Sequence, residues 1–529
     1  MAMSGLGLVG KNTSFRPPLV YCVRKIRRSS TAAVETVVEP HTLKEEPKRS
    51  VTSRRIVPAE EFGVPQWKKL SSKELGITTS MIEKATRIVL NGLKKKGYEV
   101  YLVGGCVRDL ILKKTPKDFD IITTAELKEV MRIFSRCEIV GKRFPICHVH
   151  VNDTIIEVSS FSTSVRKYGK DLTHILRKPP GCNENDYIRW RNCLKRDFTI
   201  NGLMLDPYAK LVYDYMGGME DIKKAKVRTV IAARTSFQED CARILRAIRI
   251  AARLDFHFAK DTAHSLKDFA SSVLKLDKGR LLMELNYMMA YGSAEPSLRL
   301  LWRFGLLEVL LPIQAAYFVA QGFQRRDKRS NMLLAMFTNL DRLLAPDRPC
   351  HSSLWVGVLA FHYALAEEYQ DPLVVATFTL AVHNGGDLSE AISIARRITK
   401  LHDNSFPELS EPKEMSDSEL MDEVLDLASS VKASLSMMTN ETFVSEAMAK
   451  YPQAPYSDLV FIPLTLYLKV CKIFDCVKRN GPEKGFVPKR GSKINYESLA
   501  EGGMQEIRHT FARVVFDTVY PPSLNLNEK

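Results

Sequence analysis

Apolar residues recur with a helical period just before the first candidate strand of the chain. Four of them lie three or four residues apart, namely Ile82, Ala85, Val89 and Leu93. Ser80 is placed to cap this helix and Gly97 to end it, which predicts a helix of about four turns. The residues that follow, 98–103, include aromatic and β-branched side chains and stop at Gly104 and Gly105, so we expect a strand that ends in a glycine turn.

Two aspartates flank a phenylalanine shortly after that turn, in the order Asp118, Phe119, Asp120. Alternate residues of a strand point to one side, so the two carboxylates are expected to project together, with their Cα atoms roughly 6–7 Å apart, while Phe119 packs inward. Like charges so placed repel each other unless a cation neutralises them, and oxygen-rich sites suit hard ions such as Mg²⁺. The pattern indicates a metal site, although an exposed acidic edge fits the same residues.

Further strands are predicted after this pair. Residues 139–149 are typical of a strand, a basic turn and a second strand, and 154–159 of a strand that carries Glu157 among apolar residues. A carboxylate in an apolar setting needs a partner, so Glu157 either supports the metal site or pairs with a basic neighbour. His148 and His150 share one face, and without a third ligand nearby we expect surface or packed histidines.

Basic residues gather without a clear period between residues 163 and 196. This segment holds nine Lys or Arg and three acids. The composition is typical of an exposed loop. We interpret it as a basic loop near the entrance for nucleotide or RNA, with a simple solvated insertion as the alternative.

A long helix is predicted at 237–256, with Glu239 and Asp240 in its first turn, where acids favour the helix dipole. Its arginines fall within an arc of about 120° at the helical period. They are Arg243, Arg246, Arg249 and Arg253. Because solvated helix faces usually alternate Lys and Glu, these arginines without an intervening acid indicate a cationic ridge, although a merely exposed helix is the alternative.

The second half of the chain is predicted to be all-helical. Leu, Met and Ala recur at helical spacing in 281–291, 297–311 and 354–368. Residues 408–423 are acidic and resemble a loop. Residues 474–493 are basic, and either contact an RNA backbone or form a solvated loop.

Composition and charge narrow the class of protein. The chain has 529 residues, 45% of them hydrophobic, which suggests three or four compact units and excludes disorder over the whole chain. The net charge of +16 suits a polyanionic partner. Ten cysteines without a C-x-x-C pair make a zinc site or a disulfide scaffold unexpected. The apolar runs are shorter than the roughly 18 residues of a membrane span, so we expect no membrane partner.

The N-terminus has the character of a targeting segment. Residues 1–34 contain six Lys or Arg and no acid, and they lack the uninterrupted apolar stretch of a secretory signal. We interpret them as an organelle transit peptide, with the chloroplast favoured over the mitochondrion; an unstructured basic tail is the alternative. Residues 35–60 are predicted to be a linker.

Four motifs, in the order in which they occur, resemble those of one family. The helix, strand, VGGCVRD (103–109), spacer and DFDI (118–121) resemble the head of the class II nucleotidyltransferases, which are the tRNA CCA-adding enzymes and bacterial-type poly(A) polymerases. KRDFTINGL (195–203) is similar to the family block RRDFTINAL, and 237–256 resembles its EDxxR motif with trailing arginines. One departure is the segment 190–192, Trp-Arg-Asn, where the family usually has an acidic stretch. The segment 139–149 looks like the one that sets poly(A) polymerases apart.

The resemblance implies roles for single residues in the head. Gly104, Gly105 and Arg108 would hold the triphosphate, and Asp118 and Asp120 would bind the catalytic metals, Mg²⁺ or Mn²⁺. Two metals would neutralise charge at the α-phosphate and at the leaving pyrophosphate.

The later motifs carry further implied roles. The residues concerned are Arg196, Asp197, Asp240, Arg243, Arg246 and Arg249. Arg196 would contact the nucleotide and Asp197 would sit by the active site as a catalytic residue. Asp240 and Arg243 would read the base edge in place of a template, while Arg246 and Arg249 would assist nucleotide binding.

The expected architecture is an α/β nucleotidyltransferase head, a small mixed sheet with helices, followed by an all-α neck and body. The boundaries are 1–60 for the transit peptide and linker, 76–225 for the head, 226–290 for the neck and 291–529 for an RNA-binding body. The expected function is a template-independent poly(A) polymerase that transfers AMP from ATP to RNA 3′ ends, with RNA and ATP but not DNA as partners. The alternatives are tRNA CCA addition and a nonenzymatic RNA-binding protein on the same fold.

Overall fold

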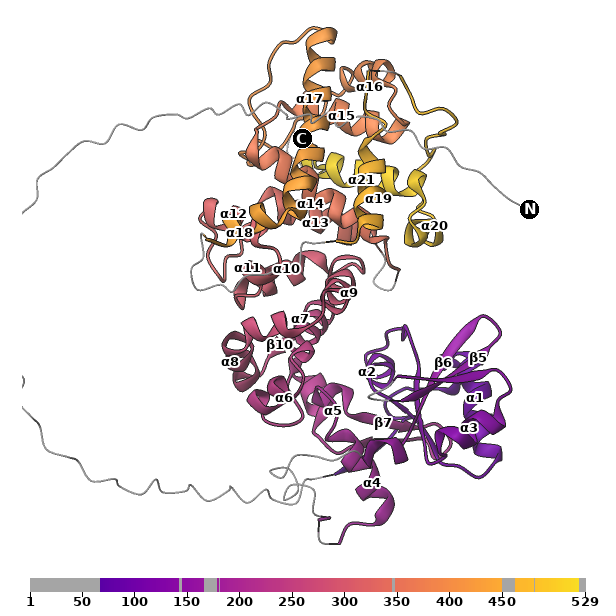
Figure 1. Cartoon of the computed structure of the whole chain (residues 1–529). Coiled ribbons are helices and arrows are strands. Elements are labelled where there is room, and N and C mark those ends of the chain that lie inside the picture. Colours follow the sequence, from indigo (N-terminus) through magenta and orange to yellow (C-terminus); the bar gives the residue numbers. More distant parts are fainter. Residues whose placement is uncertain are drawn as a thin grey trace, which may run out of the picture. The chain divides into compact units, whose positions relative to one another are not determined.

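A computed structural model describes residues 67–141, 145–165, 178–179, 181–344, 348–449, 462–479 and 481–522. The predicted transit peptide and linker lie outside these residues, and so does the basic turn at 142–144. Figure 1 shows a head built around a β-sheet, followed by helices as far as the C-terminal end of the described chain. The expected fold class, a mixed α/β head followed by an all-α neck and body, is therefore confirmed.

The head contains one sheet of eight strands. They are β1 (Lys68–Ser71), β2 (Val100–Val103), β3 (Asp120–Thr123), β4 (Cys137–Val140), β5 (Ile146–Val151), β6 (Thr154–Ser160), β7 (Leu203–Asp206) and β8 (Leu211–Asp214). Their order across the sheet is β1-β8-β7-β2-β3-β6-β5-β4. Within this sheet, as far as the structure describes it, only the β3–β6 pair is parallel. Because β1 pairs with β8, the sheet begins before residue 76, where the head was predicted to start.

A different hydrophobic cluster packs against each face of the sheet. Val100 and Leu102 of β2 join the main core under α1 (Lys84–Lys95) and α3 (Leu127–Ile133). Tyr101 of the same strand joins a second cluster with Trp190 of α4 (Glu184–Cys193) on the opposite face. Because alternate side chains of β2 point to opposite faces of the sheet, this strand contributes to the hydrophobic cluster on each face.

Two local predictions in the head need correction. The first helix is shorter than expected, because residues 79–81 form a 3₁₀ turn and Glu83, not Ser80, is its N-cap. The described end of the predicted basic loop is helix α4, capped by Asn183. Arg189 of α4 is buried, and it donates to Asp186 and to two tyrosine hydroxyls, so this cation belongs to the packing of the head.

The remaining described elements are helical apart from one small pair of strands. The head also contains α2 (Gly105–Ile111) and α5 (Gly218–Lys223). The neck contains β9 (Lys226–Val227), α6 (Ala233–Glu239), α7 (Ala242–Leu254), β10 (His257–Phe258), α8 (Lys260–Asp268) and α9 (Lys278–Met289). The body contains α10 (Ala294–Arg303), α11 (Leu307–Leu310), α12 (Pro312–Ala320), α13 (Met332–Leu343), α14 (Ser352–Glu367), α15 (Pro372–Asn384), α16 (Leu388–Ala395), α17 (Asp417–Thr439), α18 (Glu441–Ala449), α19 (Leu464–Phe474), α20 (Tyr496–Glu501) and α21 (Met504–Val519). The all-helical prediction for the second half is confirmed.

Three predicted boundaries in this half are wrong for local reasons. The helix expected at 237–256 breaks at Asp240, whose backbone is extended (φ −149°, ψ 100°), and continues as α7. The helix expected at 297–311 breaks at Gly305, where φ is +74°. The loop expected at 408–423 ends early, because Ser416 and Glu419 form a capping box that starts α17.

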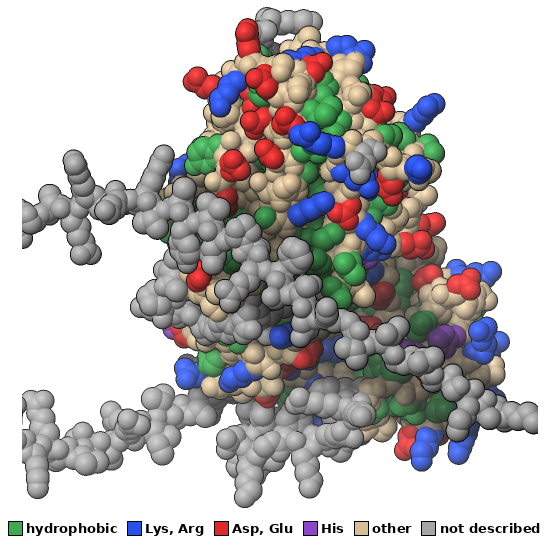
Figure 2. Space-filling view, turned by 45° about the horizontal axis from the view of Figure 1, so that its top comes forward, with side chains coloured by type: hydrophobic (Ala, Val, Ile, Leu, Met, Phe, Trp, Pro, Cys, Tyr) green, Lys and Arg blue, Asp and Glu red, His purple; other side chains and the backbone are tan. Residues whose placement is uncertain are grey.

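The surface carries charged side chains of both signs. Figure 2 shows Lys and Arg side chains interspersed with Asp and Glu over the face drawn there. Within the described part of the chain, no helix has the length and apolar character needed to cross a membrane.

His362 of α14 is a titratable group inside the body core. Its side chain is 1% exposed, its ring centroid lies 4.4 Å from that of Tyr317, and its Nε2 atom has no hydrogen-bond partner among the described residues. Burial lowers the pKa of His362 from 6.5 to about 3. Between these two pKa values the unfolded chain binds a proton that the folded chain does not, so stability falls as the pH drops below 6.5.

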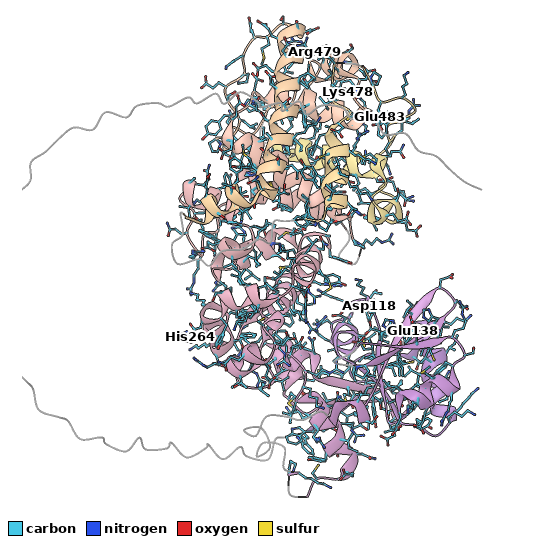
Figure 3. The ribbon with its side chains drawn as sticks, in the orientation of Figure 1. Asp118, Glu138, His264, Lys478, Arg479 and Glu483 are labelled. Carbon is cyan, nitrogen blue, oxygen red and sulfur yellow. The ribbon has the colours of Figure 1, made fainter. Side chains whose placement is uncertain are left out.

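Replacing this histidine with an aromatic residue that does not titrate should remove that dependence. Between pH 6.5 and pH 5 the wild-type chain should lose about 2 kcal/mol of unfolding free energy through His362, and His362→Phe should lose that much less. Urea denaturation at the two pH values measures the difference. His264→Gln is the control, because the His264 side chain on α8 is 78% exposed (Figure 3). An equal loss in wild type and His362→Phe would contradict the buried, neutral state.

Candidate active site

The glycine turn between β2 and α2 is the geometric centre of the site. Gly104 has φ +80° and ψ −140° and is the N-cap of α2. A Cβ atom at this position would lie 3.2 Å from Asp120 Oδ2 and 3.4 Å from Arg196 Nη1. The turn, a carboxylate and a guanidinium from three separate segments therefore converge, as the sequence motifs predicted.

The other members of the glycine motif lie in α2. Gly105 begins the helix, and Arg108 follows one turn later with its side chain buried. Arg108 donates to Asn201 Oδ1 (2.7 Å) and, through Nε, to Asp109 Oδ1 (2.9 Å). Its guanidinium is thus held at the base of the turn by protein groups, within 3.5 Å of a Cβ placed on Gly105.

The aspartate pair lies at the start of β3. Asp120 is the first residue of the strand, opposite Val103 of β2, whereas Asp118 precedes the strand, so the expectation that both stand in a strand is wrong for Asp118. The pairing between β2 and β3 ends at Val103 and Asp120, because the chain after β2 turns away from the sheet at Gly104. The expected alternation nevertheless holds, since Phe119 is buried, Asp120 half-buried and Asp118 exposed.

Electrostatics make this pair a good acceptor of a divalent cation. Burial raises the pKa of Asp120 and Asp118 raises it further, against the opposing effects of Arg196 and Arg246. Ionised Asp120 is therefore destabilised until another cation approaches. Among the described residues no group of three or more Asp, Glu, His or Cys side chains is placed to hold an ion. Mg²⁺ is commonly bound through one or two carboxylates together with substrate phosphates, so the two aspartates fit such an ion.

Glu157 is the neighbour of Asp120 in the sheet. The two residues are register partners in the parallel β3–β6 pair, and burial followed by the charge of Asp120 raises the pKa of Glu157. Its side chain is 53% exposed, and its Oε1 atom lies 3.9 Å from His148 Nε2. The structure thus supplies the basic neighbour that was one of the two open interpretations. His148 and His150 each face a glutamate, which agrees with surface histidines.

Asp197 is buried where the head meets the neck. Its Oδ1 atom accepts hydrogen bonds from Asn201 Nδ2 (3.0 Å) and the Phe198 amide (2.8 Å), and its Oδ2 atom lies 3.2 Å from Arg246 Nη2. Burial alone would raise the pKa of Asp197, but Arg246 and these hydrogen bonds hold it below its usual value. Asp197 therefore remains ionised and ties the motif at 195–203 to α7.

The arginines of α7 lie on one face of the helix, as predicted, but, contrary to the prediction, they are not free of acidic partners. Ile244, Leu245 and Ile248 are fully buried while the arginines are half-buried, which confirms the two faces. The prediction that these arginines form a cationic ridge without acidic partners is wrong, because carboxylates outside α7 pair with three of them. The pairs are Arg243–Glu239 (3.3 Å), Arg246–Asp197 (3.2 Å) and Arg249–Glu284 (3.0 Å).

The two residues expected to read the base lie at the break between α6 and α7. Asp240 Oδ1 accepts from the Ala242 amide (3.1 Å), and its Oδ2 atom lies 3.7 Å from Arg280 Nη2 of α9. Arg243 donates to Ser236 Oγ (2.8 Å) and to the Lys195 carbonyl (3.3 Å). The structure therefore brings Arg243 into contact with the motif at 195–203, whereas Asp240 contacts α9.

A contact between Lys117 and α9 was missed from the sequence. Lys117 Nζ donates to Tyr291 Oη (3.1 Å) and lies 4.9 Å and 4.6 Å from the ring centroids of Tyr287 and Tyr291. Lys117 precedes Asp118, which Figure 3 places on the side of the head toward α9. The sequence pattern does not predict this contact or the one between Arg280 and Asp240, because in each case the two residues are far apart in the chain.

Arg249 can be tested as a partner of the buried Glu284, whose side chain is 3% exposed. Arg249→Met should lower the unfolding free energy by about 3 kcal/mol, since it leaves a buried carboxylate without its cation. The double variant Arg249→Met/Glu284→Gln should recover most of that loss. Thermal and urea unfolding of the three proteins measure the effect, and an equal loss in the single and double variants would contradict the pairing. KM for ATP in the double variant separately reports any direct role of Arg249 with nucleotide.

Comparisons with known proteins identify the family of the chain. The family model "Poly A polymerase head domain" matches residues 100–228, and "Probable RNA and SrmB- binding site of polymerase A" matches 255–318. Poly(A) polymerase I of Salmonella typhimurium is 30% identical over 392 residues, which is 72% of this chain and 78% of that protein. A CCA-adding enzyme of Staphylococcus aureus is 34% identical over 220 residues, 41% of this chain and 52% of that protein.

A solved structure of a CCA-adding enzyme was also found. The Bacillus stearothermophilus enzyme in complex with CTP is 21% identical, with 74% of this chain and 91% of that chain covered and a TM-score of 0.42. The sequence matches to relatives extend from the head into the helical body. The chain therefore belongs to the nucleotidyltransferase family of bacterial-type poly(A) polymerases and tRNA CCA-adding enzymes.

Proposed function

We propose that this nucleotidyltransferase is a poly(A) polymerase, which transfers AMP from ATP to the 3′ end of RNA. The observation that carries the proposal is the convergence of Asp120 and Arg196 on the Gly104 turn. The extent of the matches supports adenylation over CCA addition, because the poly(A) polymerase match spans 392 residues and the CCA-adding match 220.

The proposed reaction is a single displacement at the α-phosphate of ATP. The 3′-hydroxyl of RNA releases its proton to solvent and its oxygen forms a new bond to the α-phosphorus, while the bond from that phosphorus to the bridging oxygen breaks and pyrophosphate leaves. Asp118 and Asp120 would hold Mg²⁺ or Mn²⁺, which neutralises charge on the reacting phosphates. Arg196 adds a fixed positive charge beside Asp120, and the glycine turn lets the triphosphate approach the backbone closely.

Base selection is assigned to the neck in this proposal. Asp240 offers carboxylate acceptors and Arg243 guanidinium donors, which together can match the edge of one base without a nucleic-acid template. Arg280 lies 3.7 Å from Asp240 and would orient that carboxylate. Arg246 and Arg249 would act mainly through their own carboxylate partners, as positioning residues for Asp197 and α9.

A nucleotide-by-primer assay tests the proposal. The full chain is incubated with Mg²⁺ and either a generic RNA or a tRNA that lacks its CCA end, and ATP or CTP is supplied alone. We expect extension of the generic RNA with ATP and none with CTP. Incorporation of C into the truncated tRNA would establish the alternative reaction, and absence of any incorporation would favour a nonenzymatic RNA-binding role.

We further propose that the chain acts in an organelle, with the chloroplast favoured. The support is the acid-free, basic composition of residues 1–34. Import of the full chain into isolated chloroplasts and mitochondria, followed by detection of N-terminal cleavage, tests this. A chain that stays uncleaved outside both organelles would contradict it.

A further inference from the structure

The body contains a polar pocket that the proposed reaction does not use. Its volume is about 720 Å³, and it lies between the end of α13, the loop before α20 and the outer face of α21. Four of its lining side chains are cations, namely Arg342, Arg348, Lys493 and Arg513. Glu497 is the single acid among the described lining residues.

The four cations have no carboxylate partner among the described residues. By contrast, two other cations of the basic segment 474–493 are neutralised, since Arg479 pairs with Asp422 (2.5 Å) and Lys489 pairs with Glu506. Figure 3 labels Arg479 on the body near α17. Lys493 is therefore one of the cations of this segment whose charge stays uncompensated among the described residues, and it is the one that lines the pocket.

The walls of the pocket are fixed by internal contacts. Arg513 Nη1 donates to the Ser492 carbonyl (2.8 Å), and Tyr496 Oη donates to the Leu343 carbonyl (3.2 Å). The Arg348 guanidinium lies 4.9 Å from the centroid of the Tyr496 ring. The pocket thus has a defined polar shape, with guanidinium groups from several elements around one space.

Hydrogen bonds connect the segment beside this pocket to the candidate active site through one end of α9. The Cys350 amide, two residues after Arg348, donates to the carbonyl of Ala290 (3.0 Å), which is the C-cap of α9. The next residue, Tyr291, accepts from Lys117, the neighbour of Asp118. The same end of α9 therefore contacts both the segment that leads from the pocket and the segment that carries the aspartate pair.

We propose that this pocket binds phosphodiester groups of the RNA strand upstream of its 3′ end. Guanidinium forks match phosphate oxygens bidentately, and four cations against one acid favour a polyanion over a neutral or apolar ligand. Binding of single-stranded RNA in such sites depends on backbone charge and tolerates any sequence. This inference rests on the proposed function, in which RNA is the substrate.

The test measures RNA binding without catalysis. Fluorescein-labelled A18 and A4 are titrated with the full chain at several KCl concentrations in the absence of ATP, and the variant is Arg348→Gln/Lys493→Gln. Each phosphate contact on single strands contributes about 0.7 to the slope of log affinity against log salt, so the slope for A18 should fall by about 1.4. We expect roughly tenfold weaker binding of A18 at low salt and unchanged binding of A4, which is too short to span both sites.

Lys95→Gln/Lys128→Gln is the matched control, because it removes two exposed lysines from α1 and α3 of the head. An A18 slope in the pocket variant equal to that of the control would overturn the proposal. Inorganic tripolyphosphate is titrated in the same way, and loss of its binding in the pocket variant with an unchanged A18 slope would also overturn the proposal, in favour of a small phosphorylated ligand. If the wild-type chain fails to extend A18 with ATP while the slope falls as expected, the proposed function fails and the pocket assignment holds.

Discussion

Asp120→Asn is expected to reduce AMP incorporation roughly 10³-fold or more. The substitution removes the negative charge that would hold the divalent ion beside the Gly104 turn, and a catalytic metal supplies several kcal/mol of transition-state stabilisation. Asn keeps the size of the side chain, so RNA affinity should not change. Steady-state incorporation from α-labelled ATP, together with equilibrium binding of A18, measures both quantities.

The stability of this variant provides an independent check. Burial raises the pKa of Asp120, which means that its ionised form opposes folding at neutral pH. Asp120→Asn should therefore unfold at the same temperature as wild type or at a higher one. Glu138→Gln is the matched control, since it removes one exposed carboxylate from β4 of the same sheet (Figure 3). Activity close to wild type in Asp120→Asn would be incompatible with the proposed role.

Gly104→Ala is expected to lose activity about 100-fold and about 1–3 kcal/mol of unfolding free energy. The backbone at Gly104 has φ +80°, which L side chains rarely adopt. The added methyl would also lie 3.2 Å from Asp120 Oδ2, so it would push the carboxylate away from its place at the turn. Urea unfolding and the incorporation assay separate the two effects.

Gly97→Ala is a close control for backbone strain alone. Gly97 also has positive φ, at +86°, but a Cβ atom there would meet no atom within 4 Å. We expect a comparable loss of stability in this variant with normal AMP incorporation per folded molecule. If both alanine variants lose activity equally, crowding of Asp120 is not the cause.

The part of the site that could be predicted from the sequence is the part built by neighbours in the chain. The Gly104 turn follows a strand, and the alternation through Asp118, Phe119 and Asp120 survives even though the strand begins only at Asp120. Local periodicity was sufficient there because strand geometry fixes the direction of each side chain. The all-helical second half followed from the same kind of signal.

Prediction failed where distant segments supply the partner. The arginines of α7 appeared unpaired in the sequence, but Asp197 and Glu284 pair with two of them. Arg189 appeared to belong to a solvated loop, yet Asp186 and two tyrosines hold it in the interior. At the break, Asp240 accepts a hydrogen bond from the nearby Ala242 amide, but its partner Arg280 lies in α9, far away in the chain.

The most direct measurement is a crystal structure of the full chain with ATP and Mn²⁺, in which the metal is located by its anomalous signal. We expect a Mn²⁺ peak bound by Asp118 and Asp120, with the triphosphate against the turn at Gly104 and beside Arg196. A triphosphate bound elsewhere, with both aspartates free of metal, would refute the assignment of this site as the place where AMP is transferred.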